Sequence, residues 1–263
     1  MIGFIGCGNM GRAIINGMMK NGFVKGKDII ASAASAATAE YIDKTLGITA
    51  ASSNAEVVEK SDIIFLAVKP QMLSHVITEI RDLNLQGKTF VSMSPGKSLA
   101  WFRGEFKKDI ALVRTAPNTP LMCGEGMTCL CANELTKEED LEQIRGIFEA
   151  SGRTALIPEK LMDTAMALGG STPAYVYMFI EALADGAVAE GMPRPLAYEI
   201  AAQTVMGSAK MVLTSGKHPG ALKDEVTSPA GTTIEGLNVL EDAGFRSAVM
   251  GAIRECVDKS RRM

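Results

Sequence analysis

The sequence predicts two domains of different class: an α/β domain over residues 1–157 and an all-α domain over residues 158–263. In the first part, short apolar runs alternate with segments of helical apolar spacing, which is typical of a parallel α/β sheet. After Pro158 the helical spacing continues with almost no alternation of period two. A chain of 263 residues is long enough for two small domains.

Each element of the α/β part is predicted from its apolar spacing. The run 61–68 is almost continuously apolar, as a parallel strand covered on both faces requires. Residues 9–21 place Ile14 and Met18 on one side of a helix, and Asn54 is a candidate N-cap. The expected strands are residues 1–5, 28–32, 48–50, 61–68, 89–93, 110–115, 126–132 and 154–157, and the expected helices are residues 9–21, 38–46, 54–60, 75–83, 99–106 and 137–150.

The second domain is expected to contain helices only. Turn-forming residues at 191–193 and 215–219 separate its predicted helices. Several of its segments, such as 174–189, are apolar on more than one face, which is typical of helices buried against another subunit. The sequence therefore predicts a homodimer formed through this domain. The expected helices are residues 161–168, 173–190, 194–215, 219–226, 232–243 and 244–261.

Composition and charge exclude several function classes. Hydrophobic residues make up 47% of the chain and the formal net charge is −3, so a broad cationic surface for nucleic acid is not expected. The first residues leave no room for a signal peptide, and no run of about 18 uncharged apolar residues exists, so we expect a cytoplasmic protein without a membrane span. Cys129 and Cys131 lack a second Cys or His pair at zinc spacing, so no metal site is predicted.

The first candidate site is residues 6–11, whose sequence G-C-G-N-M-G has the form G-x-G-x-x-G. It follows a predicted strand and opens a predicted helix, as a dinucleotide fingerprint requires. Gly6 would permit the tight turn, Gly8 would let the backbone approach a pyrophosphate, and Gly11 would let the helix pack close to the strand. The diphosphate would lie on the free amides of the helix N-terminus. The sequence thus predicts a Rossmann-type domain that binds a dinucleotide.

Residues at the end of the second strand are expected to contact the adenosine ribose, so their chemistry should indicate whether the cofactor is NAD or NADP. An acid there would bind a 2′-hydroxyl, and an arginine would accept a 2′-phosphate. Between Ile29 and Ala39 there is neither, and Ser32, Ser35 and Thr38 offer hydroxyl groups only. Because no charged side chain is present there, this part of the sequence does not distinguish NADP from NAD as the cofactor.

Three further loops follow predicted strands, at the edge where open α/β sheets bind ligands. They are residues 67–71, 94–96 and 117–120. Lys69 would either face a cofactor phosphate or be a solvated lysine. The prolines and glycines of the other two loops would either present backbone amides to a ring or simply form turns.

The most unusual stretch of the helical part is residues 227–235, T-S-P-A-G-T-T-I-E. Packing between helices does not need such a loop of small residues. Thr232 and Glu235 have the spacing of a capping box, so a helix should begin here. Its free amides would bind an anion, and Thr233 adds a hydroxyl group. An ordinary N-cap without a ligand is the alternative.

Together these residues resemble the pyrroline-5-carboxylate reductase family over essentially the whole chain. The segments that carry the resemblance are F-I-G-x-G-N-M at 4–10, A-V-K-P-Q at 67–71, P-N-T-P at 117–120, P-A-Y-V at 173–176 and, as the family signature, D-x-V-T-S-P-x-G-T-T-I at 224–234. The resemblance implies a Rossmann-type domain, an all-helical dimerisation domain and often a ring of dimers. It also implies reduction of the cyclic imine 1-pyrroline-5-carboxylate to L-proline by NAD(P)H, commonly NADPH, as the last step of proline biosynthesis.

The resemblance further implies the site residues. Thr233 is the candidate catalytic residue, because the matched loops hold no His or carboxylate to protonate the ring nitrogen; it would hydrogen-bond that nitrogen and relay a proton from water. The substrate-binding residues would be Ser228, Ala230, Gly231, Thr232 and Thr233. The cofactor-binding residues would be Gly6, Gly8, Asn9, Met10, Gly11, Ser32, Asn54, Ala67, Val68, Lys69, Pro70, Ser94, Pro95 and Gly96.

The sequence departs from the family pattern at four places. Ala33 and Ala34 stand where many members have polar or basic residues, Pro95 stands for alanine, and Ala230 and Thr172 stand for glycines. Pro95 and Ala230 restrict the backbone. We expect the activity to survive these changes.

Two alternatives share this organisation. A β-hydroxyacid dehydrogenase needs a lysine on the first long helix of the second domain, and residues 173–190 contain none; another imine reductase is a related possibility. A dinucleotide-binding sensor without activity should have lost the signature loop, yet Ser228, Gly231 and Thr233 are all present.

Overall fold

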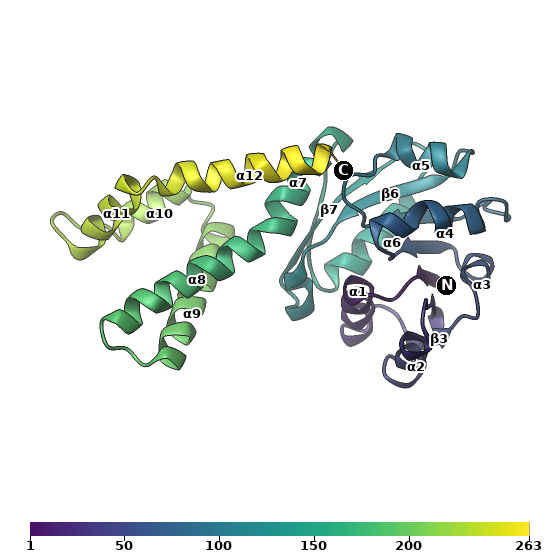
Figure 1. The fold of residues 1–263 in the computed structure, drawn as a ribbon, viewed down its shortest axis with the longest axis horizontal. Coiled ribbons are helices and arrows are strands. Elements are labelled where there is room, and N and C mark those ends of the chain that lie inside the picture. Colours follow the sequence, from purple (N-terminus) through teal and green to yellow (C-terminus); the bar gives the residue numbers. More distant parts are fainter. Residues whose placement is uncertain (263) are drawn as a thin grey trace. The chain divides into compact units, whose positions relative to one another are not determined.

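The computed structural model describes residues 1–262. They divide into two compact units (Figure 1). The first contains Met1–Ser171 together with the end of the chain from Cys256, and the second contains Thr172–Glu255. Among the described residues, no helix is both long enough and apolar enough to cross a membrane.

The first unit is built on an eight-stranded sheet with the order β3-β2-β1-β4-β5-β6-β7-β8. Strands β1 to β6 run parallel, β7 is antiparallel to β6, and β8 is parallel to β7. A fully parallel sheet was therefore the wrong expectation for β7: only the short 3₁₀ turn η3 (Thr119–Cys123) lies between β6 and β7, and a short connection reverses the chain. The strands are β1 (Ile2–Ile5), β2 (Ile29–Ser32), β3 (Thr49–Ala50), β4 (Ile63–Leu66), β5 (Thr89–Ser92), β6 (Ala111–Ala116), β7 (Gly126–Ala132) and β8 (Gly152–Leu156).

Helices cover both faces of this sheet, which confirms the α/β class (Figure 1). Successive residues of β1 enter different cores, because side chains of a strand alternate between its two faces. Phe4 packs with residues of α1 (Asn9–Lys20), α2 (Ala36–Lys44) and α6 (Glu138–Glu149). Ile5 packs with residues of the helices on the other face, which are α3 (Asn54–Lys60), α4 (Leu73–Ile80) and α5 (Leu99–Phe106).

Local capping sets some helix starts differently from the expectation. The N-cap of α3 is Ser53, whose hydroxyl accepts from the Glu56 amide at 3.1 Å, so Asn54 as N-cap was wrong. Helix α2 begins at Ala36 instead of residue 38, because Ser35 caps it. The expected helix 161–168 is shorter and irregular: the 3₁₀ turn η4 (Glu159–Leu161) and α7 (Met162–Ala165) lead into a π-helical segment, η5 (Met166–Ser171).

The second unit is helical throughout its regular elements, as expected. Helices α8 (Thr172–Ala189) and α9 (Arg194–Ser215) pack against each other along their length (Figure 1). They are followed by α10 (Pro219–Glu225), α11 (Thr232–Asp242) and α12 (Phe245–Arg261), whose last residues belong to the first unit. Large apolar side chains are exposed on these helices, among them Tyr177, Met178, Met206 and Leu213.

Candidate functional site

The predicted glycine turn lies between β1 and α1. Gly6 has φ +87°, a left-handed conformation that side chains with a β-carbon rarely adopt. A β-carbon at Gly6 would lie 2.8 Å from Val68 Cγ1 and 2.9 Å from the Ala67 carbonyl oxygen. Only glycine fits here, so the loop after β1 and the loop after β4 touch each other at this point.

The N-terminus of α1 is open in the way that an anion requires. Its N-cap is Gly8, with no side-chain cap and no acidic residue in the first turn, so no side chain occupies its first amides. A β-carbon at Gly8 would meet nothing within 4 Å. The residues therefore fit a dinucleotide diphosphate approaching this turn.

Gly11 is different. A β-carbon there would lie 3.5 Å from Ala67 Cβ and 3.7 Å from the Gly6 carbonyl oxygen, which are ordinary contacts. The helix does lie close to its neighbours here, as expected of Gly11, but an alanine would fit at this position as well.

A hydrogen-bonded chain at the end of β2 brings together three predicted cofactor residues, Gly6, Ser32 and Asn54. The Gly6 amide donates to Ser32 Oγ at 3.3 Å, and Ser32 Oγ donates to Asn54 Oδ1 at 2.6 Å. Asn54 Nδ2 in turn donates to Glu79 Oε2 at 2.6 Å. Because Ser53 caps α3, the Asn54 side chain is available for this network.

The remaining predicted cofactor residues follow β4, which pairs with β1, and β5, which pairs with β4. The Ala67 amide donates to the Ile5 carbonyl at 2.9 Å, and Lys69 is exposed before the 3₁₀ turn η2 (Pro70–Met72). Ser94 is buried, and its amide donates to Ser92 Oγ at 3.3 Å. All these loops lie at the carboxyl ends of parallel strands, and the order of the strands reverses between β1 and β4, where such sheets bind ligands.

Asn118, in the loop after β6, ties this edge to the π-helical segment. Its Oδ1 accepts from the Met127 amide at 2.9 Å, and its Nδ2 donates to the Gly169 carbonyl at 3.2 Å. A cavity of ≈ 350 Å³ lies nearby in the same unit, lined in part by Pro95, Pro117 and Gly170. The predicted loops 94–96 and 117–120 therefore border one cavity.

The predicted substrate-binding residues belong to the second unit, in the loop between α10 and α11. The loop closes with a turn in which the Gly231 amide donates to the Ser228 carbonyl at 3.0 Å. Ala230 has φ +54° and is one of two residues other than glycine with positive φ among residues 1–262. A β-carbon at Gly231 would lie 2.4 Å from Ser228 Oγ and 3.1 Å from the Ser228 carbonyl oxygen, so a larger residue there would displace the Ser228 hydroxyl group.

Helix α11 begins at Thr232 as expected, but not through a capping box. Its N-cap is Gly231, and no side chain caps the helix. Thr232 and Thr233 are exposed, and neither side chain has a hydrogen bond to another described residue. The capping-box prediction was wrong, and its failure leaves the first amides of α11 open for an anion.

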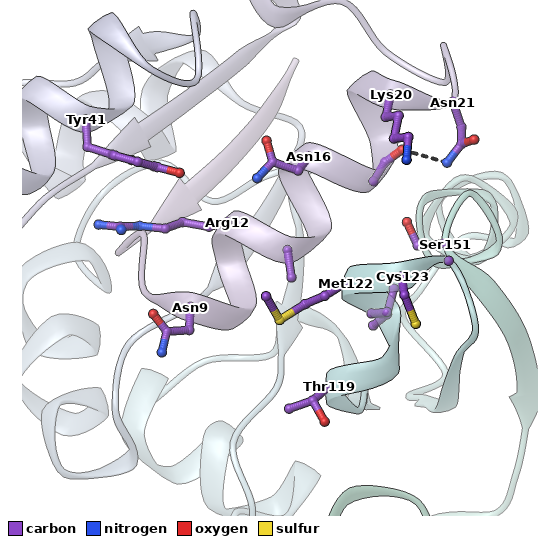
Figure 2. Close-up of a pocket in the computed structure, with 14 residues that line it drawn as sticks. Asn9, Arg12, Asn16, Lys20, Asn21, Tyr41, Thr119, Met122, Cys123 and Ser151 are labelled. Atoms are coloured by element: carbon purple, nitrogen blue, oxygen red, sulfur yellow. Dashed lines mark hydrogen bonds between the residues drawn. The ribbon is translucent and has the colours of Figure 1, made fainter. Parts of the chain in front are cut away.

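Sequence reasoning missed Arg12 and Tyr41. They line a cavity of ≈ 640 Å³ beside α1, together with residues of η3 (Figure 2). The Arg12 guanidinium lies 4.0 Å from the centroid of the Tyr41 ring. Burial raises the pKa of the neighbouring Cys7 thiol, and Arg12 opposes that rise, so the thiol stays protonated at neutral pH. Arg12 directly follows the fingerprint, but its contact with Tyr41 depends on how two helices pack.

Fold and site together define a class: a dinucleotide-dependent oxidoreductase with a Rossmann-type domain followed by a helical domain. Comparison with known proteins agrees with this class. Residues 1–96 match the family described as NADP oxidoreductase, coenzyme F420-dependent. Residues 159–263 match the family described as pyrroline-5-carboxylate reductase dimerisation.

Whole-chain relatives specify the family. The chain is 45% identical over 262 residues to pyrroline-5-carboxylate reductase of Escherichia coli, covering 100% of this chain and 97% of that protein. It is 42% identical over the same length to the reductase of Methanosarcina acetivorans, again covering 97% of that protein. A solved structure of the Plasmodium falciparum pyrroline carboxylate reductase with NADP bound has a TM-score of 0.90 and 34% identity, covering 99% of this chain and 97% of that chain. The chain belongs to the pyrroline-5-carboxylate reductase family.

Proposed function

We propose that this protein reduces 1-pyrroline-5-carboxylate to L-proline with NADPH, as the last step of proline biosynthesis. The observation that carries the proposal is the uncapped N-terminus of α11, which opens directly after the signature loop 227–231. The turn of this loop has Ala230 in a left-handed conformation, followed by Gly231. The backbone amides that follow the turn are suited to bind a small carboxylate. Family membership over the whole chain supports the same reaction.

The first unit supplies the cofactor site in this proposal. NADPH supplies the hydride when it is bound. Residues 6–11 hold the diphosphate on the first amides of α1, and Ser32 and Asn54 hydrogen-bond the adenosine ribose. The loops 67–70 and 94–96 hold the nicotinamide end.

The signature loop supplies the substrate site. The amides of residues 230–233 bind the carboxylate, and Ser228 lies in the same turn. This fixes the orientation of the ring, and positioning of that kind lowers the barrier to hydride transfer. Thr233 hydrogen-bonds the ring nitrogen and relays a proton from water to it. A threonine hydroxyl is a weak acid, so we infer that part of the substrate arrives already protonated.

Steady-state turnover tests the proposal. The purified full-length protein is mixed with NADPH or NADH, with and without 1-pyrroline-5-carboxylate, and the loss of the near-ultraviolet absorbance of reduced nicotinamide is followed. We expect oxidation that depends on the imine, with L-proline as product. Oxidation of 3-hydroxyisobutyrate in a parallel assay with NADP⁺ or NAD⁺, seen as formation of reduced nicotinamide, would refute it, and so would cofactor binding with no turnover of any substrate.

We also propose that the protein is a homodimer that associates through the helices of residues 158–263, and that dimers assemble into a ring. The exposed apolar side chains of α8 and α9 support an association surface. The domain boundary at 157/158 and a cytoplasmic location are part of the same proposal, and the five free cysteines are compatible with a reducing compartment. Light scattering coupled to size-exclusion chromatography tests the assembly.

A further inference from the structure

Arg12 is held between the glycine turn and α2. Its Nε donates to the Cys7 carbonyl at 3.0 Å, and its guanidinium lies over the Tyr41 ring at 4.0 Å. Figure 2 shows the side chain leaving α1 toward Tyr41. Both side chains are half-buried. Stacking on an aromatic ring and a backbone hydrogen bond fix the plane of the guanidinium before any ligand arrives.

The rest of this guanidinium is available to a ligand. No carboxylate pairs with Arg12 among residues 1–262, and the Cys7 carbonyl is the one oxygen that it reaches there. The cavity that it borders is lined by two cations, Arg12 and Lys20, and by no acidic residue. A planar guanidinium with free N–H groups is the side chain best suited to a phosphate.

The end of β2, where the adenosine ribose is expected, is tied to the same turn. Ser32 Oγ accepts from the Gly6 amide at 3.3 Å, and Gly6 directly precedes Cys7, whose carbonyl holds Arg12. Tyr41 belongs to α2, which directly follows β2. Residues 32–35 are S-A-A-S, so no acid is present to select a free 2′-hydroxyl and repel a phosphate.

We propose that Arg12, oriented by Tyr41, binds the 2′-phosphate of the adenosine ribose and so makes this protein bind NADPH more tightly than NADH. The positive charge that the end of β2 lacks comes from the first helix instead. The inference rests on the proposed function only for the binding of a nicotinamide dinucleotide, because it does not depend on which substrate is reduced.

Equilibrium binding tests this inference separately from activity. Dissociation constants are measured by calorimetry for NADPH, NADH, 2′,5′-ADP and ADP, with the wild type, Arg12→Ala, Arg12→Lys and Lys20→Ala. Lys20 is the matched control, because it is a cation on the same helix and lines the same cavity. Thermal unfolding of each variant shows whether the fold is retained.

We expect the wild type to bind NADPH and 2′,5′-ADP more tightly than NADH and ADP. Arg12→Ala should weaken both phosphorylated ligands about 10- to 100-fold, the range of a lost charge-assisted hydrogen bond, and leave NADH and ADP nearly unchanged. Arg12→Lys should keep part of the preference, because it keeps the charge but not the stacked fork. Lys20→Ala should change none of the four.

Three results would overturn the inference. The first is a wild type that binds NADPH and 2′,5′-ADP no more tightly than NADH and ADP, and the second is an Arg12→Ala variant that keeps the preference for the phosphorylated ligands. The third is an equal loss of affinity for all four ligands in Arg12→Ala, which would mean that Arg12 only stabilises the glycine turn. If the preference disappears in Arg12→Ala while 1-pyrroline-5-carboxylate is not reduced by the wild type, the proposed function fails and this inference stands.

Discussion

The backbone amide of Gly6 donates a hydrogen bond to the side-chain oxygen of Ser32 at 3.3 Å, and this contact joins the glycine turn to the end of β2. Ser32 is 5% exposed, so replacing it leaves Asn54 and the Gly6 amide without their partner in a buried place. We predict that Ser32→Ala lowers the free energy of unfolding by about 1–2 kcal/mol and weakens cofactor binding. Chemical denaturation and calorimetry measure the two effects, and Ser74→Ala, on the exposed side of α4, is the control. Unchanged cofactor affinity in Ser32→Ala would remove it from the site.

The two glycines of the turn should separate stability from binding. Gly6→Ala places a β-carbon against Val68 and Ala67 in a left-handed backbone, so we predict a loss of about 2 kcal/mol or more in the free energy of unfolding. Gly8→Ala meets no protein atom within 4 Å and should leave stability within about 1 kcal/mol of the wild type. It should nevertheless weaken cofactor binding at least about tenfold, because the new methyl group stands where the diphosphate approaches. Full affinity in Gly8→Ala would contradict this placement of the diphosphate.

Thr233 should matter for the rate and not for the fold. Its side chain is exposed and makes no hydrogen bond to another described residue, so Thr233→Ala should leave the unfolding temperature unchanged. We predict a loss in kcat/KM of about 100-fold, toward the lower end of what a positioned proton donor contributes. Thr214→Ala, on α9, is the matched control. An unchanged kcat/KM would exclude Thr233 from the mechanism.

Replacing Ala230 by glycine should leave the free energy of unfolding unchanged or raise it. At φ +54° the alanine carries a steric cost of about 1 kcal/mol that glycine lacks, while glycine adds entropy to the unfolded chain. We predict that Ala230→Gly changes the free energy of unfolding by between zero and about +1 kcal/mol. Ala202→Gly, inside α9, should lower it by about 1 kcal/mol. A clear destabilisation by Ala230→Gly would show that the left-handed alanine is not strained.

The carboxylate of Glu56 should make the free energy of unfolding vary with pH in the acidic range. Hydrogen bonds from Lys60 and from Ser52 lower the pKa of its carboxyl group from 4.5 to about 2. Because the folded-state pKa is depressed, the contribution is present above pH 4.5 and is lost as the pH falls toward 2. The difference in unfolding temperature between the wild type and Glu56→Gln should therefore be largest above pH 4.5 and shrink below it. A difference independent of pH, or an equal effect in Glu59→Gln, would contradict this account.

Sequence patterns predicted the bounds of helices and strands best where the apolar periodicity and the flanking turn residues indicate the same limits. The helix of residues 194–215 and the strand of residues 126–132 have the predicted bounds, because turn residues flank long segments of one periodicity. The run 61–68 was predicted as one strand, but β4 ends at Leu66, because the loop from Ala67 turns away to meet Gly6. The direction of β7 depends on a short connection, and apolar spacing carries no information about direction.

The candidate site was predictable where its residues are close together in sequence. The fingerprint 6–11 and the loop 227–235 could be identified for that reason. The contact between Arg12 and Tyr41 and the chain from Gly6 through Ser32 to Asn54 join distant segments, so they appear only when helices and strands are packed. The absence of a side-chain cap on α11 is also a matter of geometry: Thr232 and Glu235 have the right spacing, but the helix begins one residue too early for them to form the box.

The central claim is that hydride passes from the nicotinamide to the imine carbon of 1-pyrroline-5-carboxylate. NADPH deuterated at the transferable position, incubated with the full-length protein and the imine, tests it most directly by mass spectrometry and NMR of the product. The account predicts L-proline with one deuterium on the ring carbon that was the imine carbon. Unlabelled proline, or deuterium transferred only to a different substrate, would contradict it.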